Sequence, residues 1–432
     1  MNIIKIIMIS MVFITLNVLA EEKSKLAIHV SKQLGSNTWL LSFQLPHNTR
    51  ALDFSHLPPN FLKQHLMLNT EASLTDKNVI QLMQSDTPLV FEITDGFDVS
   101  ELRFNAPFIN FSDNSAFFAD FIIPLSVTVS GQLLERQAFD VAFTLSVLNE
   151  DWHTVNTREL DSASLSSTEQ FISLKAPIKT KGERIAYLIE PDFPSAFKVQ
   201  VEQIIDGFMD FFEQQSGQSL ARDITFLISG DSNAPYIGFL GSALNNQVML
   251  NISGKEAVIH PEKFKRPIYL TLAHEIFHLW NAHLWSPKEN TPIWLYEGSA
   301  DFFAYHAMLQ QGLMPQSHFD YFLQQQQKAC LEGVKQAAIT YLESTSAIGA
   351  SYPCGRVFFE ELTKALNKSH FEIWQDLMAV NRAVQYSVED VHSLIKQSKV
   401  PSDIKQQLEH VLFDNKKAHN ALEKLLLAPA IE

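Results

Sequence analysis

The period of the hydrophobic pattern changes once along the chain, and this change constrains the fold more than any other feature. From about Lys25 to Leu148, apolar and polar residues alternate, as in the stretches WLLSFQL, LSVTV and FDVAFTLSVL. Alternation with period two is typical of strands that bury one face. This part of the chain is therefore predicted to form an antiparallel, sandwich-like β domain.

A polar, serine-rich segment from Asn156 to Gln170 follows, and we interpret it as a loop or linker. Beyond it, apolar residues recur every three or four positions between Ser195 and Gly217, which predicts a helix capped by that serine and ended by that glycine. The runs ITFLIS (224–229) and QVMLNIS (247–253) are typical of short strands.

Two further helices are expected, one from near Pro267 and one from near Pro292 to about Gly312, and more amphipathic helices follow them. The chain has 432 residues, which is too long for one compact core, so two or three domains are expected. The pattern predicts an α+β protein with three parts after the first twenty residues: an N-terminal antiparallel β-sandwich-like domain at 21–170, an α/β domain at 171–320 and a helical domain at 321–432.

The first twenty residues have the pattern of a secretory signal peptide. A lysine precedes an apolar run that starts at Ile6, and Val18 and Ala20 stand at positions −3 and −1 of a cut before Glu21. An uncleaved membrane anchor is the alternative, but the apolar span is short for one. We therefore expect an exported protein, periplasmic or secreted, with no stable membrane anchor after cleavage.

The chain has only two cysteines, Cys330 and Cys354. In an oxidising compartment such a pair is expected to form a disulfide, and two free buried thiols are the alternative. The formal net charge of −15 argues against general nucleic-acid binding, which needs a basic surface. We expect no nucleic-acid partner.

The stretch TLAHEIFHLWNAH contains a metal-binding pattern. His274 and His278 are four residues apart, so on a helix they lie on one face and can reach one ion. Glu275 lies on the neighbouring flank, where it can reach a water molecule instead of the metal. Two ordinary histidines of a core helix are the alternative, and a third ligand is needed to decide.

Glu297 supplies that third ligand, on the next expected helix and with 18 residues between it and His278. Two imidazoles and one carboxylate leave one position open on zinc, as catalytic zinc sites do. Asp301 follows Glu297 by four and is placed to accept the second N–H of a ligand histidine, most simply His274. A capping or surface acid is the alternative for Asp301.

His283 lies five residues after His278 and is a weaker candidate. A longer zinc-protease pattern would place a third histidine at position 284, which is Leu284, and would need a glycine that is absent. We therefore interpret His283 as a substrate-side or surface residue.

These motifs resemble those of the gluzincin metallopeptidases. HEIFH, the 18-residue gap and WLYEG resemble the membrane alanyl aminopeptidase family, whereas HEIFHLWN followed by EGSAD is more similar to the glycyl aminopeptidase family. The resemblance covers about Asp223 to Glu361 and implies a thermolysin-like catalytic domain. It also implies that His274, His278 and Glu297 bind one Zn²⁺ per chain, with Glu275 as the general base.

The resemblance further implies a tyrosine that stabilises the oxyanion, within a Y-x-K-G-like turn. The stretch SYPCGRVFFEEL offers Tyr352 with Gly355 in register, although Cys354 replaces the usual lysine, and Tyr341 is the second choice. A bond between Cys330 and Cys354 would then hold the loop that carries Tyr352.

One motif departs from the family pattern. Alanyl aminopeptidases carry a G-A-M-E-N-like strand whose glutamate binds the free amino terminus of the substrate, and the counterpart here is GSALNN, Gly241 to Asn246. Leu244 or Asn245 stands where that acid is expected. The strand is still expected to bind a peptide backbone edge to edge through Gly241, Ala243 and Asn245.

The sequence therefore predicts an exported, aminopeptidase-like zinc metallopeptidase that acts on peptides or proteins. The alternative from another class is a catalytically retired peptidase scaffold that only binds peptides, which the missing amine-binding acid favours. The complete set of ligands, base and tyrosine argues against it. The sequence gives neither the oligomeric state nor the choice between cleavage at a chain end and within a chain.

Overall fold

A computed structural model describes residues 24–33, 38–57, 62–63, 66–68, 72–83, 89–94, 108–113, 115–148, 154–161, 170–179, 184–244, 246–381 and 385–428. The predicted signal peptide at 1–20 and the predicted substrate-binding residue Asn245 lie outside these described residues. Within them, no helix combines the length and the apolar character needed to cross a membrane.

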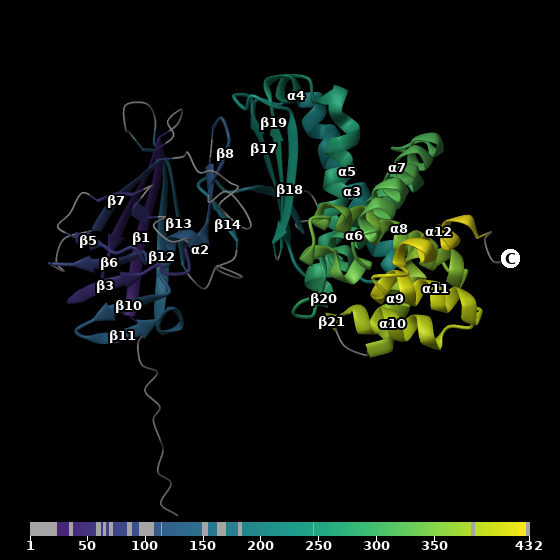
Figure 1. The fold of residues 1–432 in the computed structure, drawn as a ribbon. Coiled ribbons are helices and arrows are strands. Elements are labelled where there is room, and N and C mark those ends of the chain that lie inside the picture. The colour runs from purple at the N-terminus through teal and green to yellow at the C-terminus, as the bar shows by residue number, and fades with distance from the viewer. Residues whose placement is uncertain are drawn as a thin grey trace, which may run out of the picture.

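The N-terminal part is a pair of β-sheets around an apolar core (Figure 1). One sheet has the order β13 (Thr154–Asp161), β12 (Phe139–Leu148), β1 (Ser24–Gln33), β2 (Thr38–Gln44), β7 (Leu89–Thr94) and β4 (Leu66–Leu68). The other has the order β11 (Gln132–Glu135), β10 (Ser126–Val129), β3 (Thr49–Asp53), β6 (Val79–Leu82) and β5 (Ala72–Leu74). Pairing is antiparallel except between β1 and β12, which run parallel.

The alternating pattern explains this core. Leu26, Ile28 and Val30 of β1 are almost fully buried, as are Leu41 and Phe43 of β2. Because successive side chains of a strand point to opposite faces, each strand contributes every second residue to the space between the sheets. The predicted β domain is thereby explained residue by residue.

The predicted linker is partly wrong. Residues 156–161 belong to strand β13, which pairs with β12 at the outer edge of its sheet, and 162–169 lie outside the described residues. An edge strand needs backbone partners on one side only and tolerates polar side chains such as Arg158 and Glu159. Because the side chains of β13 are polar, the sequence pattern did not indicate a strand here.

A small sheet of β14 (Phe171–Ser173), β9 (Ser115–Phe118) and β8 (Phe108–Asn110) lies between this part and the next. The side chains of Phe111, Ala116 and Phe171 from this region pack against Leu227 and Met249 of the middle sheet. The two parts of the chain therefore share an apolar contact.

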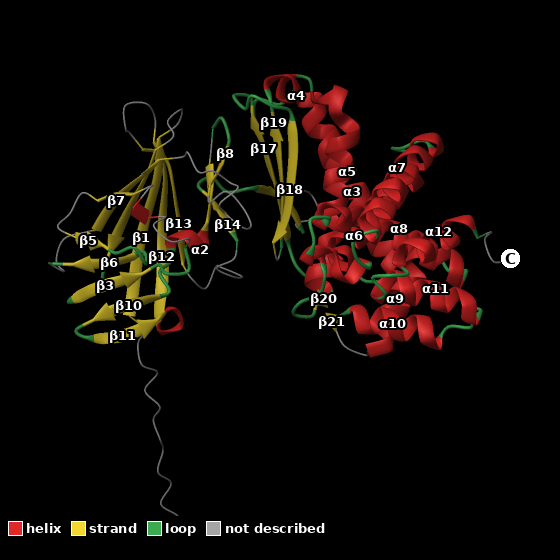
Figure 2. Ribbon diagram, in the orientation of Figure 1, coloured by secondary structure: helices red, strands yellow, loops and turns green. Residues whose placement is uncertain are grey.

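The middle part is a five-stranded mixed sheet backed by helices (Figure 2). Its order is β15 (Ile178–Lys179), β16 (Ile185–Ile189), β17 (Ile224–Asp231), β19 (Gln247–Ser253) and β18 (Gly238–Leu244). β16, β17 and β19 are parallel, and β18 is an antiparallel edge strand. Both strands predicted here, at 224–229 and 247–253, are confirmed by β17 and β19.

Helix α3 (Ser195–Ser216) packs in this part, and the predicted capping serine is wrong. Pro194 occupies the cap position with extended dihedral angles, no side chain caps the helix, and Ser195 is the first helical residue. Gly217 ends the helix in the left-handed conformation at φ +67°, as predicted, because glycine adopts positive φ without steric cost.

The remaining chain is helical, as predicted. Its helices are α4 (Lys255–Ile259), α5 (Lys265–His278), α6 (Ile293–Gln310), α7 (Gln316–Val334), α8 (Ser351–Leu366), α9 (His370–Asn381), α10 (Val388–Gln397), α11 (Ser402–Phe413) and α12 (Ala418–Leu427). The exception is a two-residue strand, β21 (Gln385–Tyr386), which pairs with β20 (Ser286–Pro287).

Candidate metal centre

Helices α5 and α6 bring three predicted ligands together. His274 and His278 lie one turn apart on α5, and Glu297 lies in the second turn of α6. The Nε2 atom of His274 is 3.0 Å from Glu297 Oε2 and 3.1 Å from His278 Nε2, and His278 Nε2 is 3.3 Å from the same Oε2. Tetrahedral zinc with bonds near 2.05 Å separates its ligands by about 3.3 Å. The three atoms fit one such ion.

The hydrogen bonds of the two imidazoles favour a cation at this point. His274 Nδ1 lies 2.8 Å from Asp301 Oδ1, and His278 Nδ1 lies 2.8 Å from Asn281 Oδ1. Because both partners are acceptor oxygens, each ring places a proton on Nδ1, and in a neutral ring Nε2 keeps the lone pair that can bind a metal ion. When both rings are neutral, the two lone pairs and the carboxylate oxygen would repel at this separation unless a positive charge, a proton or a metal ion, lies between them.

The charges around the ligands also favour a cation at this point. Burial lowers the pKa of His274, but its hydrogen bonds to Asp301 and Glu297 outweigh this and raise the pKa well above its usual value. Burial raises the pKa of Glu297, but the hydrogen bonds from His274 and His278 outweigh this and hold the pKa far below its usual value. The pocket is therefore anionic and stabilises a cation.

Glu275 lies beside the ligands on α5 and outside the donor group. Its side chain is buried, and this burial raises the pKa of the carboxyl group. Gly241 of β18 packs directly against it, since a Cβ atom at position 241 would come within 2.5 Å of Glu275 Oε1. Only glycine leaves room for the carboxylate at this place.

Tyr352 also lies next to the ligands, and it comes from a different helix. It stands in the first turn of α8, not in a loop as expected, and its ring is stacked on that of His274 with centroids 6.3 Å apart. Burial, and then the charge of nearby Glu297, raise the pKa of Tyr352 above its usual range, so the hydroxyl keeps its proton. Tyr341 lies on a 3-10 segment at Ile339–Ser344 and is exposed.

The two cysteines are bonded to each other. Cys330 of α7 and Cys354 of α8 form a disulfide, and both are buried. Because Cys354 follows Tyr352 by two residues, the bond ties the first turn of α8 to α7.

We expect Cys330→Ala with Cys354→Ala to lower the free energy of unfolding by about 3.5 kcal/mol, since the bond closes a loop of 24 residues. Denaturant titration measures this loss, and the single variant Cys330→Ala serves as a control that should lose nearly as much. An unfolding free energy equal to that of the wild type would contradict a stabilising role for the bond.

Three residues around the site were not found from the sequence. Asn281 fixes His278, donates its Nδ2 hydrogens to the oxygens of Tyr296 and Ser299, and is fully buried. The ring of Tyr296 stacks on His278 with centroids 4.5 Å apart. Tyr386 donates its hydroxyl hydrogen to Asn281 O at 2.7 Å. Asn281 could have been found, because it lies one turn after His278.

His283 lies on the π-helical turn Leu279–Leu284 that continues α5, and it does not belong to the donor group. Burial lowers its pKa to about 4, so the ring is neutral. Its buried Nε2 has no hydrogen-bond partner among the described residues, and its backbone oxygen accepts a hydrogen bond from Arg222 Nη2 at 3.1 Å.

A second group, His306, Glu360 and His370, also brings three donor atoms within 4.8 Å of one another. Here His306 Nε2 donates to Glu360 at 2.9 Å, and the fully buried Arg356 places Nε 3.8 Å from the same carboxylate. One guanidinium already balances one carboxylate, so a divalent cation would add a costly uncompensated charge to this pocket. The first group is therefore the better candidate for a metal centre.

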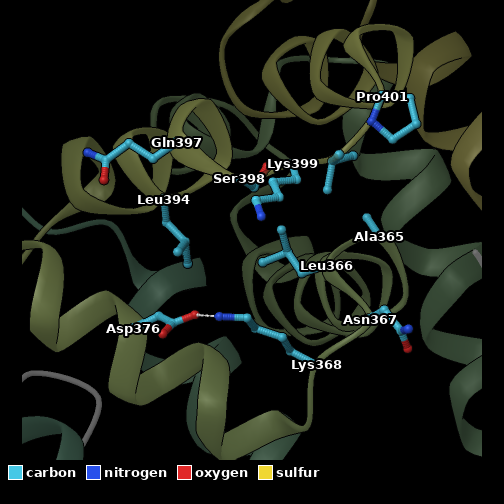
Figure 3. Close-up of a pocket in the computed structure, with 11 residues that line it drawn as sticks. Ala365, Leu366, Asn367, Lys368, Asp376, Leu394, Gln397, Ser398, Lys399 and Pro401 are labelled. Atoms are coloured by element: carbon cyan, nitrogen blue, oxygen red, sulfur yellow. Dashed lines mark hydrogen bonds and ion pairs between the residues drawn. The ribbon is translucent and has the colours of Figure 1, made fainter.

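A cavity of about 640 Å³ lies elsewhere, between the end of α8 and α9 and α10 (Figure 3). Leu366 and Leu394 line it, and Lys368 and Asp376 form an ion pair across it. Leu366 follows Tyr352 by 14 residues, or about 21 Å of helix. None of the predicted site residues lines this cavity.

The predicted strand at GSALNN is present as β18, and Gly241 and Ala243 lie on it. Within the described part of the chain, β19 is its only paired neighbour, so β18 forms one edge of this sheet. The roles of these residues in substrate binding stay predictions.

Comparison with known proteins supports the fold. No family model and no curated protein matches the sequence. An aminopeptidase N family protein from Idiomarina loihiensis has a similar structure, with a TM-score of 0.61 and 14% identity over 90% of this chain and 76% of that one. Native yeast LTA4 hydrolase aligns with a TM-score of 0.49 and 12% identity, over 91% and 68% of the two chains.

The chain therefore has the fold of the aminopeptidase N family protein. This confirms the predicted α+β class, with its N-terminal β part, α/β middle and helical end. The predicted domain boundaries at 170 and 320 stay predictions.

Proposed function

We propose that this protein is a zinc-dependent metallopeptidase. The observation that carries the proposal is the convergence of His274, His278 and Glu297, whose donor atoms lie 3.0–3.3 Å apart while both imidazole protons are engaged elsewhere. The likeness in fold to an aminopeptidase N family protein supports the same class of reaction.

The chemistry follows from the groups around the ligands. Zinc bound by His274, His278 and Glu297 would polarise the substrate carbonyl and acidify a water molecule. Glu275 would take a proton from the attacking water and pass it to the leaving amine nitrogen, so that the C–O bond forms and the C–N bond breaks. Tyr352 would donate its hydroxyl hydrogen to the carbonyl oxygen as negative charge develops there.

Strand β18 would hold the substrate. An extended peptide can pair with the open edge of β18, and Gly241 would then place the peptide backbone beside Glu275. The partner is a peptide or protein. We also propose that the protein works after export, since a disulfide persists best in an oxidising compartment.

The test is hydrolysis of a mixed peptide digest by zinc-replete protein, read by mass spectrometry. We expect cleavage that a chelator abolishes and that one equivalent of zinc restores. Stoichiometric zinc without cleavage of any peptide would contradict the proposal and indicate a protein that only binds peptides.

A further inference from the structure

The two segments that border the metal centre contain no charged residue. Residues 232–254 include β18, residues 344–355 lead into α8, and neither contains Asp, Glu, Lys, Arg or His. At the chain's overall 19% of charged residues, about seven would be expected in segments of this combined length. Both segments are therefore neutral in a chain of net charge −15, and they carry Gly241 beside Glu275 and Tyr352 beside His274.

Exposed apolar side chains gather on the same two segments. Single exposed apolar residues are ordinary, but a group of them beside a site indicates a binding surface. Among the described residues, five of the exposed large apolar residues come from these segments: Tyr236, Ile237, Leu240, Ile348 and Tyr352.

These residues approach the ligands from two directions. Leu240 is 63% exposed and immediately precedes Gly241, so its side chain lies on the face of β18 away from Glu275, where alternate side chains of a paired peptide would lie. Ile348 is followed within one turn by Tyr352, which lies beside His274. A peptide paired with β18 would therefore have apolar surfaces close to its scissile bond.

Among the described residues at the metal centre, the carboxylates already have other partners and leave none for a free amino terminus. Glu297 is held by both ligand histidines, Asp301 accepts from His274, and Glu275 is packed against Gly241 as the base. Near Ala243, the end of β18 faces the turn where Arg222 binds the backbone of His283. An ammonium group taken from water without an acceptor is costly to bury.

We propose that the site binds an uncharged, apolar stretch within a peptide chain and does not select a free amino terminus. This inference rests on the proposed peptidase function and names its substrate class. The neutral segments contact the residues around the scissile bond, and the edge of β18 holds the backbone on both sides of it.

Three matched peptides test this proposal with the zinc-replete full chain. The first has an apolar stretch and a free amino terminus, the second is its acetylated form, and the third carries Lys and Glu beside the bond that is cleaved in the first two. We expect kcat/KM for the acetylated peptide to equal or exceed that for the free one, and at least a tenfold lower value for the charged peptide.

A tenfold or greater preference for the free amino terminus would overturn the inference, and so would equal cleavage of the charged peptide. Either result would leave the proposed peptidase intact. Cleavage of none of the three, nor of any peptide in a mixed digest, would instead overturn the proposed function together with this inference.

A matched pair of variants tests whether the substrate binds at the apolar surface beside β18. Leu240→Glu places a charge next to Gly241, and Leu133→Glu makes the same change at a residue that is 57% exposed on β11 of the N-terminal sheet. We expect Leu240→Glu to raise KM for the acetylated apolar peptide at least tenfold with zinc content unchanged, and Leu133→Glu to leave KM unchanged. Equal KM values in the two variants would contradict the assignment of this surface.

Discussion

Glu275→Gln is expected to keep one zinc per chain and to lower kcat by a factor of about 10² to 10⁴. The amide has nearly the same shape as the carboxylate, so it fits beside Gly241 and leaves the three ligands in place. It cannot accept the proton of the attacking water, which is the step assigned to this side chain. Initial rates on a cleaved peptide and zinc content, measured on the same sample, check both parts.

Glu262→Gln is the matched control, because Glu262 is an exposed carboxylate just before α5. We expect it to retain the wild-type rate. Turnover by Glu275→Gln close to that of Glu262→Gln would contradict the role of Glu275 as general base, whatever the metal content.

Gly355→Ala is the second substitution with a large expected effect. Helices α6 and α8 cross at Gly298 and Gly355, and a Cβ atom at Gly355 would lie 2.0 Å from the backbone oxygen of Trp294 and 2.6 Å from the Cα of Gly298. Backbone atoms cannot move aside as a flexible side chain can, so the helices must separate. Since α6 carries Glu297 and α8 carries Tyr352, the separation displaces one from the other.

We expect Gly355→Ala to lower the free energy of unfolding by about 3 kcal/mol and to lower kcat/KM by a factor of about 10². Denaturant titration and steady-state kinetics measure the two losses. Gly349→Ala is the control, because a Cβ atom at Gly349 meets nothing within 4 Å and φ is not positive there. Equal stability of the two variants would show that the crossing tolerates a methyl group.

The metal centre could be predicted largely because its ligands follow local rules. His274 and His278 are one helical turn apart, and Glu297 needed only a short return to a second helix. Spacing on regular helices fixes which side chains share a face, so three ligands and Asp301 could be named without a structure.

The residues that hold the ligands in place could not be predicted in the same way. Tyr386 reaches the backbone of Asn281 across a separation of 105 residues, and the stacking of Tyr352 on His274 joins helices α8 and α5. Such contacts depend on how helices and strands pack, and no periodicity in the sequence encodes them. The same holds for β13, whose polar residues are satisfied only because β12 lies beside it.

Pro194 shows that the first residue of helix α3 could not be predicted from the sequence pattern. Serine at a helix start usually caps it, yet here the proline before it takes the extended cap conformation and Ser195 enters the helix. The shift is one residue, and it changes the role of the serine completely.

The most direct test of the central claim is the zinc content of purified, metal-replete protein after exhaustive dialysis. We predict one zinc per chain in the wild type, nearly none in His274→Ala, and one in His370→Ala, which removes a histidine from the second buried group. A wild type without stoichiometric zinc, or a loss of zinc in His370→Ala instead of His274→Ala, would contradict the metal centre described above.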